Sequence, residues 1–308
     1  MSFVRRWPSL ADQLALATRL YGHHGEPMVA DWLDHQESLI DNTDFAREFA
    51  DHIELPGISP LDYCHRHLRT HRGELVAGIR FYNRNIDRPF IEVLAHTFND
   101  IDALADCVSA EWSIFSAPFM RLRTQPGRIT GHNTFLDQSI HVARYHQMPA
   151  PDGRVQLEIF TIVDDAIALV ADRYDHLAQD QPELADNLSP AAADDLRRWH
   201  AHRQLRAVRT HNSTVGVLAV APGSIGWITG DEINEEVIST PHSGHGYAAS
   251  AQTTWAAHIA TDPEQFLIGT IDRHNHASRR TALAVGRPPV LADTFVALDS
   301  PPDPAARR

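Results

Sequence analysis

The residues best suited to chemistry lie in one glycine-bearing turn of the 308-residue chain, at 239–250, which reads Ser-Thr-Pro-His-Ser-Gly-His-Gly-Tyr-Ala-Ala-Ser. An apolar, strand-like run at 225–238 precedes it, and a helical run at 246–260 follows. First-turn N–H groups lack partners within their helix, and the helix dipole adds partial positive charge there. Glycine also lets a phosphate approach the backbone. The turn is therefore predicted to hold a phosphate, although a plain strand–helix connection would use the same residues.

Acidic residues gather on the strand that leads into this turn: Asp231, Glu232, Glu235 and Glu236. A carboxylate there can take a proton from an amine, directly or through a water. Strand alternation puts Glu232 and Glu236 on one face and Asp231 and Glu235 on the other. A solvated acidic strand end is the alternative explanation for each of them.

Twenty histidines raise the question of a metal site. Cys64, His65, His67 and His71 gather at the end of a predicted helix, but no second pair follows at zinc-ligand spacing. Surface histidines explain this group better, and no metal site is predicted. His242, His245, His274 and His276 flank the turn, where His245 or His274 could line the mouth of its site.

Two series of elements position these residues. In the first half, the patterns predict helices at 10–21, 27–39, 44–52 and 60–70, a hairpin at 74–83 and 90–96, a helix at 99–112 and a strand at 117–123. A strand at 133–145 could cross between halves, and the linker Pro-Ala-Pro-Asp-Gly follows at 149–153.

The second half repeats part of this order. It predicts a strand at 155–162, helices at 164–179 and 189–204, strands at 205–211, 214–220 and 225–238, the helix after the turn, a strand at 266–271, a helix at 275–285, and closing strands at 289–291 and 294–298. The shared order of elements indicates an internal duplication. This inference rests on the order of the elements alone, because the residues of the two halves do not match.

Residues 154–298 resemble the GNAT acyltransferase superfamily, whose members transfer acyl groups from coenzyme A to amines. The family motif Arg/Gln-x-x-Gly-x-Gly/Ala aligns with Ser243 to Ala248, with Gly246 in fourth place and Ala248 in sixth. Ser243 departs from the motif in first place. The family's Asn-x-x-Ser/Ala helix matches Asn275 and Ser278, but its usual Tyr would fall at Ala282.

The resemblance implies an α/β (α+β) fold class with tandem GNAT-like folds, each a mixed, mostly antiparallel sheet flanked by helices. The expected domains are a degenerate GNAT-like domain at 1–126, a crossing strand and linker at 127–153, an acetyltransferase domain at 154–300 and a disordered tail at 301–308. In the first half, the corresponding turn at 97–102 has no glycine and carries two acids, which would repel a pyrophosphate. That half is not expected to bind coenzyme A.

The resemblance also implies roles for single residues. Acetyl-CoA would be the co-substrate, held by Ile238, Ser243, Gly244, His245, Gly246, Tyr247, Ala248 and Asn275. Glu235 or Glu236 would act as the base, and Ser278 is a candidate proton donor to the leaving thiolate. Main-chain N–H groups would supply most of the anion field in place of the motif Arg or Gln.

The expected function is acyl transfer from coenzyme A to an amine of a small molecule; the alternative is a non-catalytic acyl-CoA-binding or regulatory protein. The formal charge of −13 argues against nucleic acid or an anionic membrane as a partner, and reflects either a cationic substrate or simple solubility. Two cysteines and the lack of an apolar signal or membrane-spanning stretch predict a cytoplasmic protein. A homodimer is one assembly the chain allows.

Overall fold

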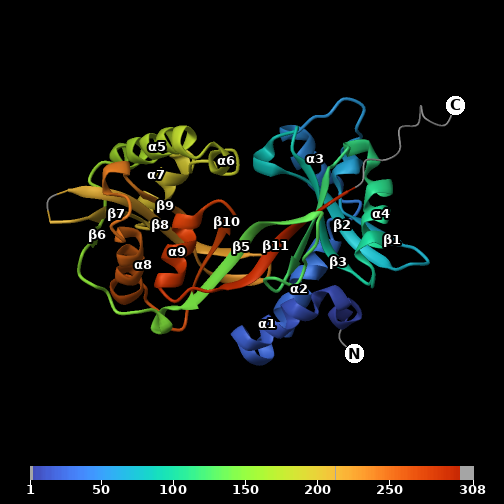
Figure 1. The fold of residues 1–308 in the computed structure, drawn as a ribbon, viewed down its shortest axis with the longest axis horizontal. Coiled ribbons are helices and arrows are strands. Elements are labelled where there is room, and N and C mark those ends of the chain that lie inside the picture. The colour runs from blue at the N-terminus through green and yellow to red at the C-terminus, as the bar shows by residue number, and fades with distance from the viewer. Residues whose placement is uncertain (1–2, 212, 299–308) are drawn as a thin grey trace. The chain divides into compact units, whose positions relative to one another are not determined.

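A computed structural model describes residues 3–211 and 213–298 of the chain, which forms two compact units (Figure 1). Unit 1 takes in the chain up to Gln138 and resumes at Leu291, and unit 2 is Ser139–Val290. The tail predicted to be disordered, 301–308, lies outside the described residues. The domain boundaries predicted at 126 and 153 stay predictions.

Unit 1 combines α-helices with a mostly antiparallel sheet. Its α-helices are α1 (Ala11–Tyr21), α2 (Gly25–Glu37), α3 (Thr43–His52) and α4 (Ile101–Glu111), with a 3-10 turn η2 at Pro8–Leu10 and another, η4, at Pro60–Tyr63. Its strands are β1 (Arg66–Arg69), β2 (Glu74–Phe81), β3 (Pro89–His96) and β4 (Phe119–Thr124), joined by the first part of β5 (Thr134–Arg144) and most of β11 (Pro289–Ala297).

The sheet of unit 1 has the order β1-β2-β3-β4-β11, with β3 and β4 parallel and the other pairs antiparallel. Alternate residues of β2, from Leu75 to Phe81, point into a core that also holds Leu104 and Val108 of α4. This two-residue period is the pattern that predicted the strand from sequence.

The chain's last described strand belongs to unit 1, where it pairs with β4 from Ala292–Thr124 to Ala297–Phe119. The two short strands predicted at 289–291 and 294–298 are one strand, and they do not close the sheet of the second half, so that prediction was wrong. Arg123 explains the placement: it binds Asp293 with Nε at 2.7 Å and Nη2 at 2.9 Å, and both side chains are buried. A bidentate pair of this kind fixes strand register as well as contributing energy.

Unit 2 alternates strands with helices. Its strands are the end of β5, then β6 (Gln156–Glu158), β7 (Leu205–Arg209), β8 (Thr214–Ile225), β9 (Ile228–Ile238) and β10 (Phe266–Asp272). Its α-helices are α5 (Val163–Asp180), α6 (Pro182–Ala185), α7 (Ala193–Ala201), α8 (Tyr247–His258) and α9 (His276–Ala284), with a 3-10 turn η8 at Thr240–His242.

Helices cover both faces of the unit 2 sheet, whose order is β10-β9-β8-β7-β6. On one face, Ala251 and Trp255 of α8 pack with Leu218 and Val220 of β8. On the other, α5 and α7 pack with Val217 and Ala219 of the same strand. Only β9 and β10 run parallel. The predicted fold class, a mixed and mostly antiparallel sheet flanked by helices, is confirmed.

Both units contain three antiparallel strands, a helix and a parallel strand in that order. These are β1, β2, β3, α4 and β4 in unit 1, and β7, β8, β9, α8 and β10 in unit 2. The repeated order that the sequence indicated is therefore present in the topology. Descent of the first half as a worn copy of the second stays a prediction.

Two helix predictions were wrong, one about the presence of the helix and one about the residue at which it begins. Residues 60–70 form only the short turn η4 before β1, because Arg66–Arg69 pairs with Glu74–Ala77 of β2. The helix predicted from 189 begins instead at Ala193, and Ser189 and Pro190 precede it without helical structure. At 66–69, pairing with β2 overrides the local helix signal. At 189–192, the helix signal of Ser189 and Pro190 is not used, because α7 starts later.

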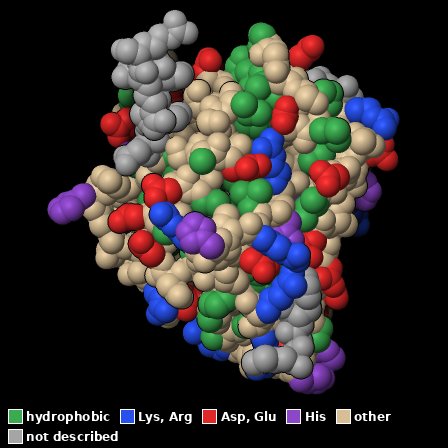
Figure 2. Space-filling view, turned by 90° about the vertical axis from the view of Figure 1, so that its right-hand side faces the viewer, with side chains coloured by type: hydrophobic (Ala, Val, Ile, Leu, Met, Phe, Trp, Pro, Cys, Tyr) green, Lys and Arg blue, Asp and Glu red, His purple; other side chains and the backbone are tan. Residues whose placement is uncertain are grey.

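Charged side chains of both signs are interspersed on the face drawn in Figure 2, with small apolar patches between them. On that face the acidic excess of the chain is not gathered into one patch. None of the helices within 3–211 and 213–298 is long and apolar enough to cross a membrane. The same residues contain no cluster of three or more His, Cys, Asp or Glu side chains able to hold a metal ion.

Candidate functional site

Two parallel strands of unit 2 separate shortly after they meet. β9 and β10 pair at Asp231–Leu267 and Glu232–Ile268, and the rest of β9, up to Ile238, has no strand partner on that edge among the described residues. The N–H of Ser239 donates to Val215 O on the opposite edge at 2.9 Å. Because N–H directions alternate along a strand, the Ile238 N–H faces the open edge. This opening leads directly to the turn singled out in the sequence.

The turn presents a run of backbone donors without acceptors. In the described part of the chain, none of the N–H groups of residues 244–249 donates a hydrogen bond to another group. Gly246 caps α8 with φ +74° and offers no side chain to cap it, and Gly244 has φ +79°. Positive φ favours glycine at both positions. Together with the α8 dipole, these N–H groups provide the donors that a bound anion would need, in the turn that the sequence singled out.

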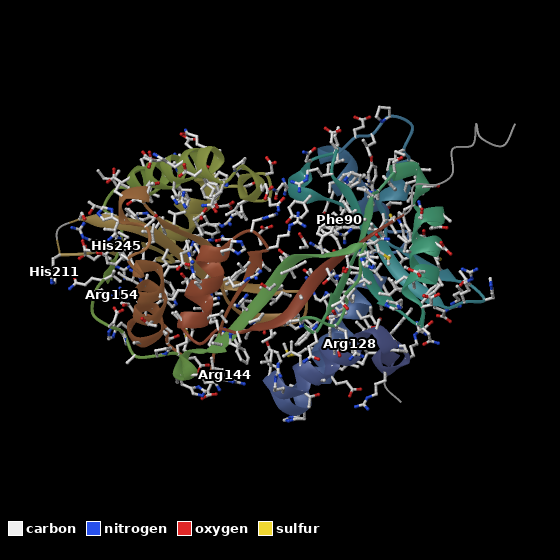
Figure 3. The ribbon with its side chains drawn as sticks, in the orientation of Figure 1. Phe90, Arg128, Arg144, Arg154, His211 and His245 are labelled. Carbon is white, nitrogen blue, oxygen red and sulfur yellow. The ribbon has the colours of Figure 1, made fainter. Side chains whose placement is uncertain are left out.

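An arginine that sequence reasoning missed completes this turn (Figure 3). Arg154 Nη1 donates to His245 O at 2.5 Å, and its Nε donates to Asp152 Oδ2 at 2.8 Å. A Cβ built on Gly246 would lie 3.1 Å from both Nη atoms of Arg154, so a larger residue would press on the guanidinium in its present position. The signal was absent because Arg154 directly follows the predicted linker at 149–153, far from the turn in sequence.

A β-bulge at Asn234 overturns the predicted faces of β9. Ala219 pairs with Glu235 and Val220 pairs with Ile233, which leaves Asn234 as the extra residue. The extra residue reverses the alternation beyond it. Glu236 therefore shares a face with Asp231, and Glu235 shares a face with Glu232. The prediction that grouped Glu232 with Glu236 was wrong, because alternation was carried through the bulge unbroken.

Glu235 points to the α5 and α7 face, where it is buried and its oxygens are occupied. Its Oε2 accepts from Ala191 N at 2.9 Å, and its Oε1 accepts from Glu236 N at 3.2 Å and from Tyr174 Oη at 3.4 Å. Burial raises the pKa of Glu235, and these hydrogen bonds partly oppose the rise. This carboxylate ties the segment before α7 to the sheet, on the face of β9 opposite to α8.

Glu236 lies half-buried on the α8 face, with one polar partner. Gln252 of α8 donates through Nε2 to both carboxylate oxygens, at 2.9 and 2.8 Å. Burial raises the pKa of Glu236 to about 7, opposed by the Gln252 bond and by the charge of Arg287. A carboxylate with a pKa near neutrality can both accept and release a proton at physiological pH.

Arg287, also missed from sequence, lies behind Glu236. It is 3% exposed, and its Nε and Nη1 have no hydrogen-bond partner. Its Nη1 lies against Gly269 of β10, 3.4 Å from where a Cβ would stand. Burial lowers the pKa of Arg287 to about 10, and Glu236 opposes that shift. A buried cation thus offsets the charge that Glu236 acquires on losing its proton.

The remaining predicted residues take separate places. Asn275 caps α9, accepting from Ser278 N at 3.0 Å, so its side chain serves the helix. Ser278 is half-buried in the first turn of α9, and within the described residues no hydrogen bond joins it to either glutamate. His245 stacks beside Tyr247 at 5.6 Å between ring centroids, at the turn. His274 Nδ1 lies 3.4 Å from Oε2 of Glu183, which belongs to the short helix α6.

Unit 1 has a corresponding opening, but its own side chains close it. β3 and β4 pair from Ile91–Met120 to Val93–Leu122 and then separate. Ser9 Oγ accepts from His96 N at 2.7 Å, and Asp100 caps α4 by accepting from Asp102 N at 3.1 Å. Two backbone N–H groups at this opening, those of His96 and Asp102, therefore have side-chain acceptors.

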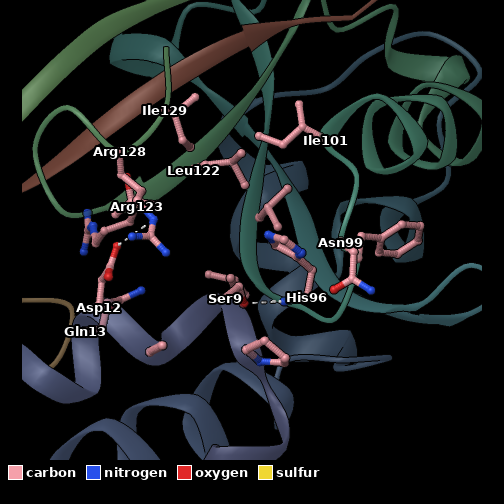
Figure 4. A pocket seen from close by; sticks show the side chains of 16 residues that line it. Ser9, Asp12, Gln13, His96, Asn99, Ile101, Leu122, Arg123, Arg128 and Ile129 are labelled. Atoms are coloured by element: carbon pink, nitrogen blue, oxygen red, sulfur yellow. Dashed lines mark hydrogen bonds and ion pairs between the residues drawn. The ribbon is translucent and has the colours of Figure 1, made fainter.

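A cavity of about 350 Å³ remains beside this closed opening (Figure 4). Arg128 and Asp12 lie on one side of it, and His96 and Asn99 lie on the other. Arg128 Nε is 3.9 Å from Asp12 Oδ2, and the lining Arg123 is bound to Asp293. The cations of the cavity are thus matched by acids, and its lining does not single out an anion.

Comparisons with known proteins bear on the fold alone. No protein-family model matches the sequence, and no curated protein matches it. Among solved structures, a GNAT-family acetyltransferase from Colwellia psychrerythraea is similar over 85% of this chain and 97% of its own, at 10% identity and a TM-score of 0.49. A GCN5-related N-acetyltransferase from Sphaerobacter thermophilus is similar over 84% and 90%, at 14% identity and a TM-score of 0.44.

A functionally unknown conserved protein from Staphylococcus epidermidis is similar over 79% of this chain and 98% of its own, at 10% identity and a TM-score of 0.42. Structures described as GNAT-family acetyltransferases thus resemble most of the chain, as the sequence motifs led us to expect. Likenesses at these scores carry no argument about activity, which has to be argued from the turn and its surroundings.

Proposed function

We propose that unit 2 transfers an acetyl or other short acyl group from coenzyme A to an amine of a small molecule. The observation that carries the proposal is the run of unpartnered N–H groups at 244–249, placed where β9 has separated from β10. A diphosphate needs several donors in a concave arrangement, and a long ligand arm needs a free strand edge beside them. Unit 2 has both features in one continuous stretch.

The residues present fit such a co-substrate. The Gly244 backbone is open, since a Cβ there would meet no atom within 4 Å, and a phosphate could approach it. The N–H of Ile238 is available to a carbonyl of the pantetheine arm. The N–H of Glu236 already donates to Glu235 Oε1 at 3.2 Å. Ser243 donates its hydroxyl to Ser239 O at 3.4 Å and adds no charge.

Bound acetyl-CoA would supply an activated acyl carbon. Glu236 takes the proton that the amine nitrogen loses as the new C–N bond forms and the C–S bond breaks. Arg287 offsets the carboxylate charge before that proton arrives. The leaving sulfur takes a proton from water or from Ser278. General-base catalysis of this kind contributes on the order of 10²- to 10⁴-fold in rate.

The proposal is tested by two measurements on the full chain. Calorimetric titration with acetyl-CoA should give one site per chain, and thiol release should rise above background with at least one amine from a panel of polyamines, amino acids and aromatic amines. Absence of binding at millimolar acetyl-CoA would contradict the proposal.

A non-catalytic acyl-CoA-binding role is the second candidate, and one observation favours it. The position at which GNAT enzymes often carry a tyrosine is Ala282, which is fully buried in α9. The protein would then bind acetyl-CoA but release no thiol with any amine. Thiol release that depends on Glu236 would reject this role.

A further inference from the structure

We propose that Arg154 is a ligand of the co-substrate's pyrophosphate and stands in for the arginine or glutamine missing at Ser243. The inference rests on the proposed function, since it concerns the same turn. It starts from an exposed cation held where the free N–H groups of α8 begin. Arg154 comes from the loop before β6, so the cation reaches the turn through space from another segment.

Two contacts fix the guanidinium at the turn. Nη1 donates to His245 O at 2.5 Å, directly before Gly246. Nε and Nη2 both donate to Asp152 Oδ2, at 2.8 and 2.5 Å. The hydrogen bond from Arg154 and then that from Ser250 lower the pKa of Asp152 to about 2, so Asp152 stays ionised across the neutral range. Asp152 positions the arginine.

The position of Asp152 is itself fixed by the helix. Ser250 Oγ donates to Asp152 Oδ1 at 2.5 Å, and Ser250 lies in the first turn of α8 and is buried. The chain from Ser250 through Asp152 to Arg154 therefore closes back on the start of the same helix. A guanidinium held this way loses little side-chain entropy when an anion binds, because that freedom is already spent.

The guanidinium keeps capacity for an anion. Each Nη carries a second N–H beyond the one used above, and the Arg154 side chain is 48% exposed. Gly246 leaves room for this contact, because a Cβ there would lie 3.1 Å from both Nη atoms and would require the guanidinium to shift. The two glycines of the turn thus differ: Gly246 lies against Arg154, whereas the surroundings of Gly244 are open to a phosphate.

The test compares Arg154→Ala and Arg154→Lys with Arg144→Ala. Arg144 is a matched control, since it also pairs with an acid, Glu264, but at another end of unit 2 (Figure 3). Each folded variant, checked by circular dichroism, is titrated with CoA, 3′-dephospho-CoA and inorganic pyrophosphate. Charge-assisted hydrogen bonds predict that Arg154→Ala weakens all three by about 10- to 100-fold. Arg154→Lys should recover part of the loss, and Arg144→Ala should change binding less than about twofold.

Each outcome decides something. If wild type binds CoA and Arg154→Ala binds it equally well, the inference is wrong and the proposed function stands. If only CoA weakens and dephospho-CoA does not, Arg154 contacts the 3′-phosphate and the pyrophosphate assignment is overturned. If wild type binds pyrophosphate through Arg154 but not CoA, the anion site stands and the proposed function fails. If wild type binds none of the three ligands, both are overturned.

Discussion

Each unit has an opening between two parallel strands. The two openings differ in which groups accept hydrogen bonds from their backbone N–H groups. In unit 1, Ser9 accepts from the strand end at His96 N, and Asp100 caps the following helix. In unit 2, the helix cap is Gly246, and the N–H groups around it have no acceptor within the described residues. The same order of strand, helix and parallel strand thus yields one turn where two side chains accept from the backbone and one whose N–H groups have no acceptor among the described residues.

This difference explains why topology alone does not assign the site. An unsatisfied N–H costs free energy wherever water cannot reach it, so a chain without a ligand there tends to fill such positions with its own acceptors. Unit 1 does so with the segment before α1 and with an acid at the helix start. Unit 2 instead brings a cation, Arg154, to the turn.

The largest expected effect concerns the two faces of β9. Glu236→Gln should lower turnover by about 10²- to 10⁴-fold with little change in CoA affinity, because it removes the base and keeps the shape. Glu235→Gln should lower turnover less than tenfold but reduce the free energy of unfolding by roughly 1–3 kcal/mol, since it disturbs a buried, hydrogen-bonded carboxylate. Steady-state kinetics and urea unfolding of both variants separate the roles. Equal losses of turnover would contradict the assignment by face.

The next effect concerns the open glycine. Gly244→Asp should weaken CoA binding by about 100-fold, because a carboxylate would face the phosphate, whereas Gly244→Asn keeps the shape without the charge and should cost about tenfold or less. Calorimetric titration measures both. Gly57→Asp in unit 1 is the control, since Gly57 also has a positive φ of +80° and open surroundings. Equal binding by the Asp and Asn variants would contradict a phosphate at this position.

A third prediction uses opposite pH responses of the two units. Burial lowers the pKa of His65 and of His96 in unit 1 to about 4, from a usual value near 6.5. Their contribution to stability is therefore complete above pH 6.5 and lost as pH falls towards 4. Burial raises the pKa of Glu236 in unit 2 to about 7, so its protonated form favours folding, and that contribution is lost as pH rises from 4.5 to 7.

Hydrogen exchange at pH 5 and pH 7, corrected for intrinsic rates, resolves the two units by peptide. We expect the free energy of opening of the amides in β2 and β3 to be lower at pH 5 than at pH 7 by about a few kcal/mol. For the amides of β9 we expect it to be higher at pH 5. His96→Gln should flatten the response of unit 1. The same direction of change in both units would contradict this account.

The smallest effect concerns how unit 1 is closed. Ser9→Ala leaves the partly buried His96 N–H without its acceptor and should lower the free energy of unfolding by about 1–2 kcal/mol, with CoA affinity unchanged. Ser38→Ala removes an exposed hydroxyl that bonds His35 O and should cost about 0.5 kcal/mol or less. Urea unfolding of both variants measures the difference. A Ser9 effect no larger than that of Ser38 would mean that water replaces the hydroxyl.

Local chemistry was readable from the sequence. The glycine-bearing turn and a helix beginning near Asn275 were both predicted, because turn and helix-start residues act within a few positions of themselves. The cap that Asn275 forms was not predicted, since this residue was expected to hold the co-substrate. The strand β5, predicted to cross between halves, indeed begins in unit 1 and ends in unit 2.

Contacts between residues that are distant in sequence could not be predicted from the sequence. The bulge at Asn234 depends on how β8 and β9 align, and the place of β11 depends on the bond between Arg123 and Asp293. Arg154 reaches the turn only because the loop before β6 folds back on α8. In each case the deciding partner is distant in sequence, and no local pattern names it. The turn could be singled out from the sequence, whereas the arginine beside it and the orientation of the acids on β9 required the structure.

One measurement tests the central claim most directly: hydrogen exchange of the full chain with and without saturating CoA. The account predicts strong protection of the amides at 244–249 and no change at 97–102, where Asp100 and Asp102 would repel a pyrophosphate. Unchanged exchange at 244–249, or protection at 97–102 instead, would contradict it.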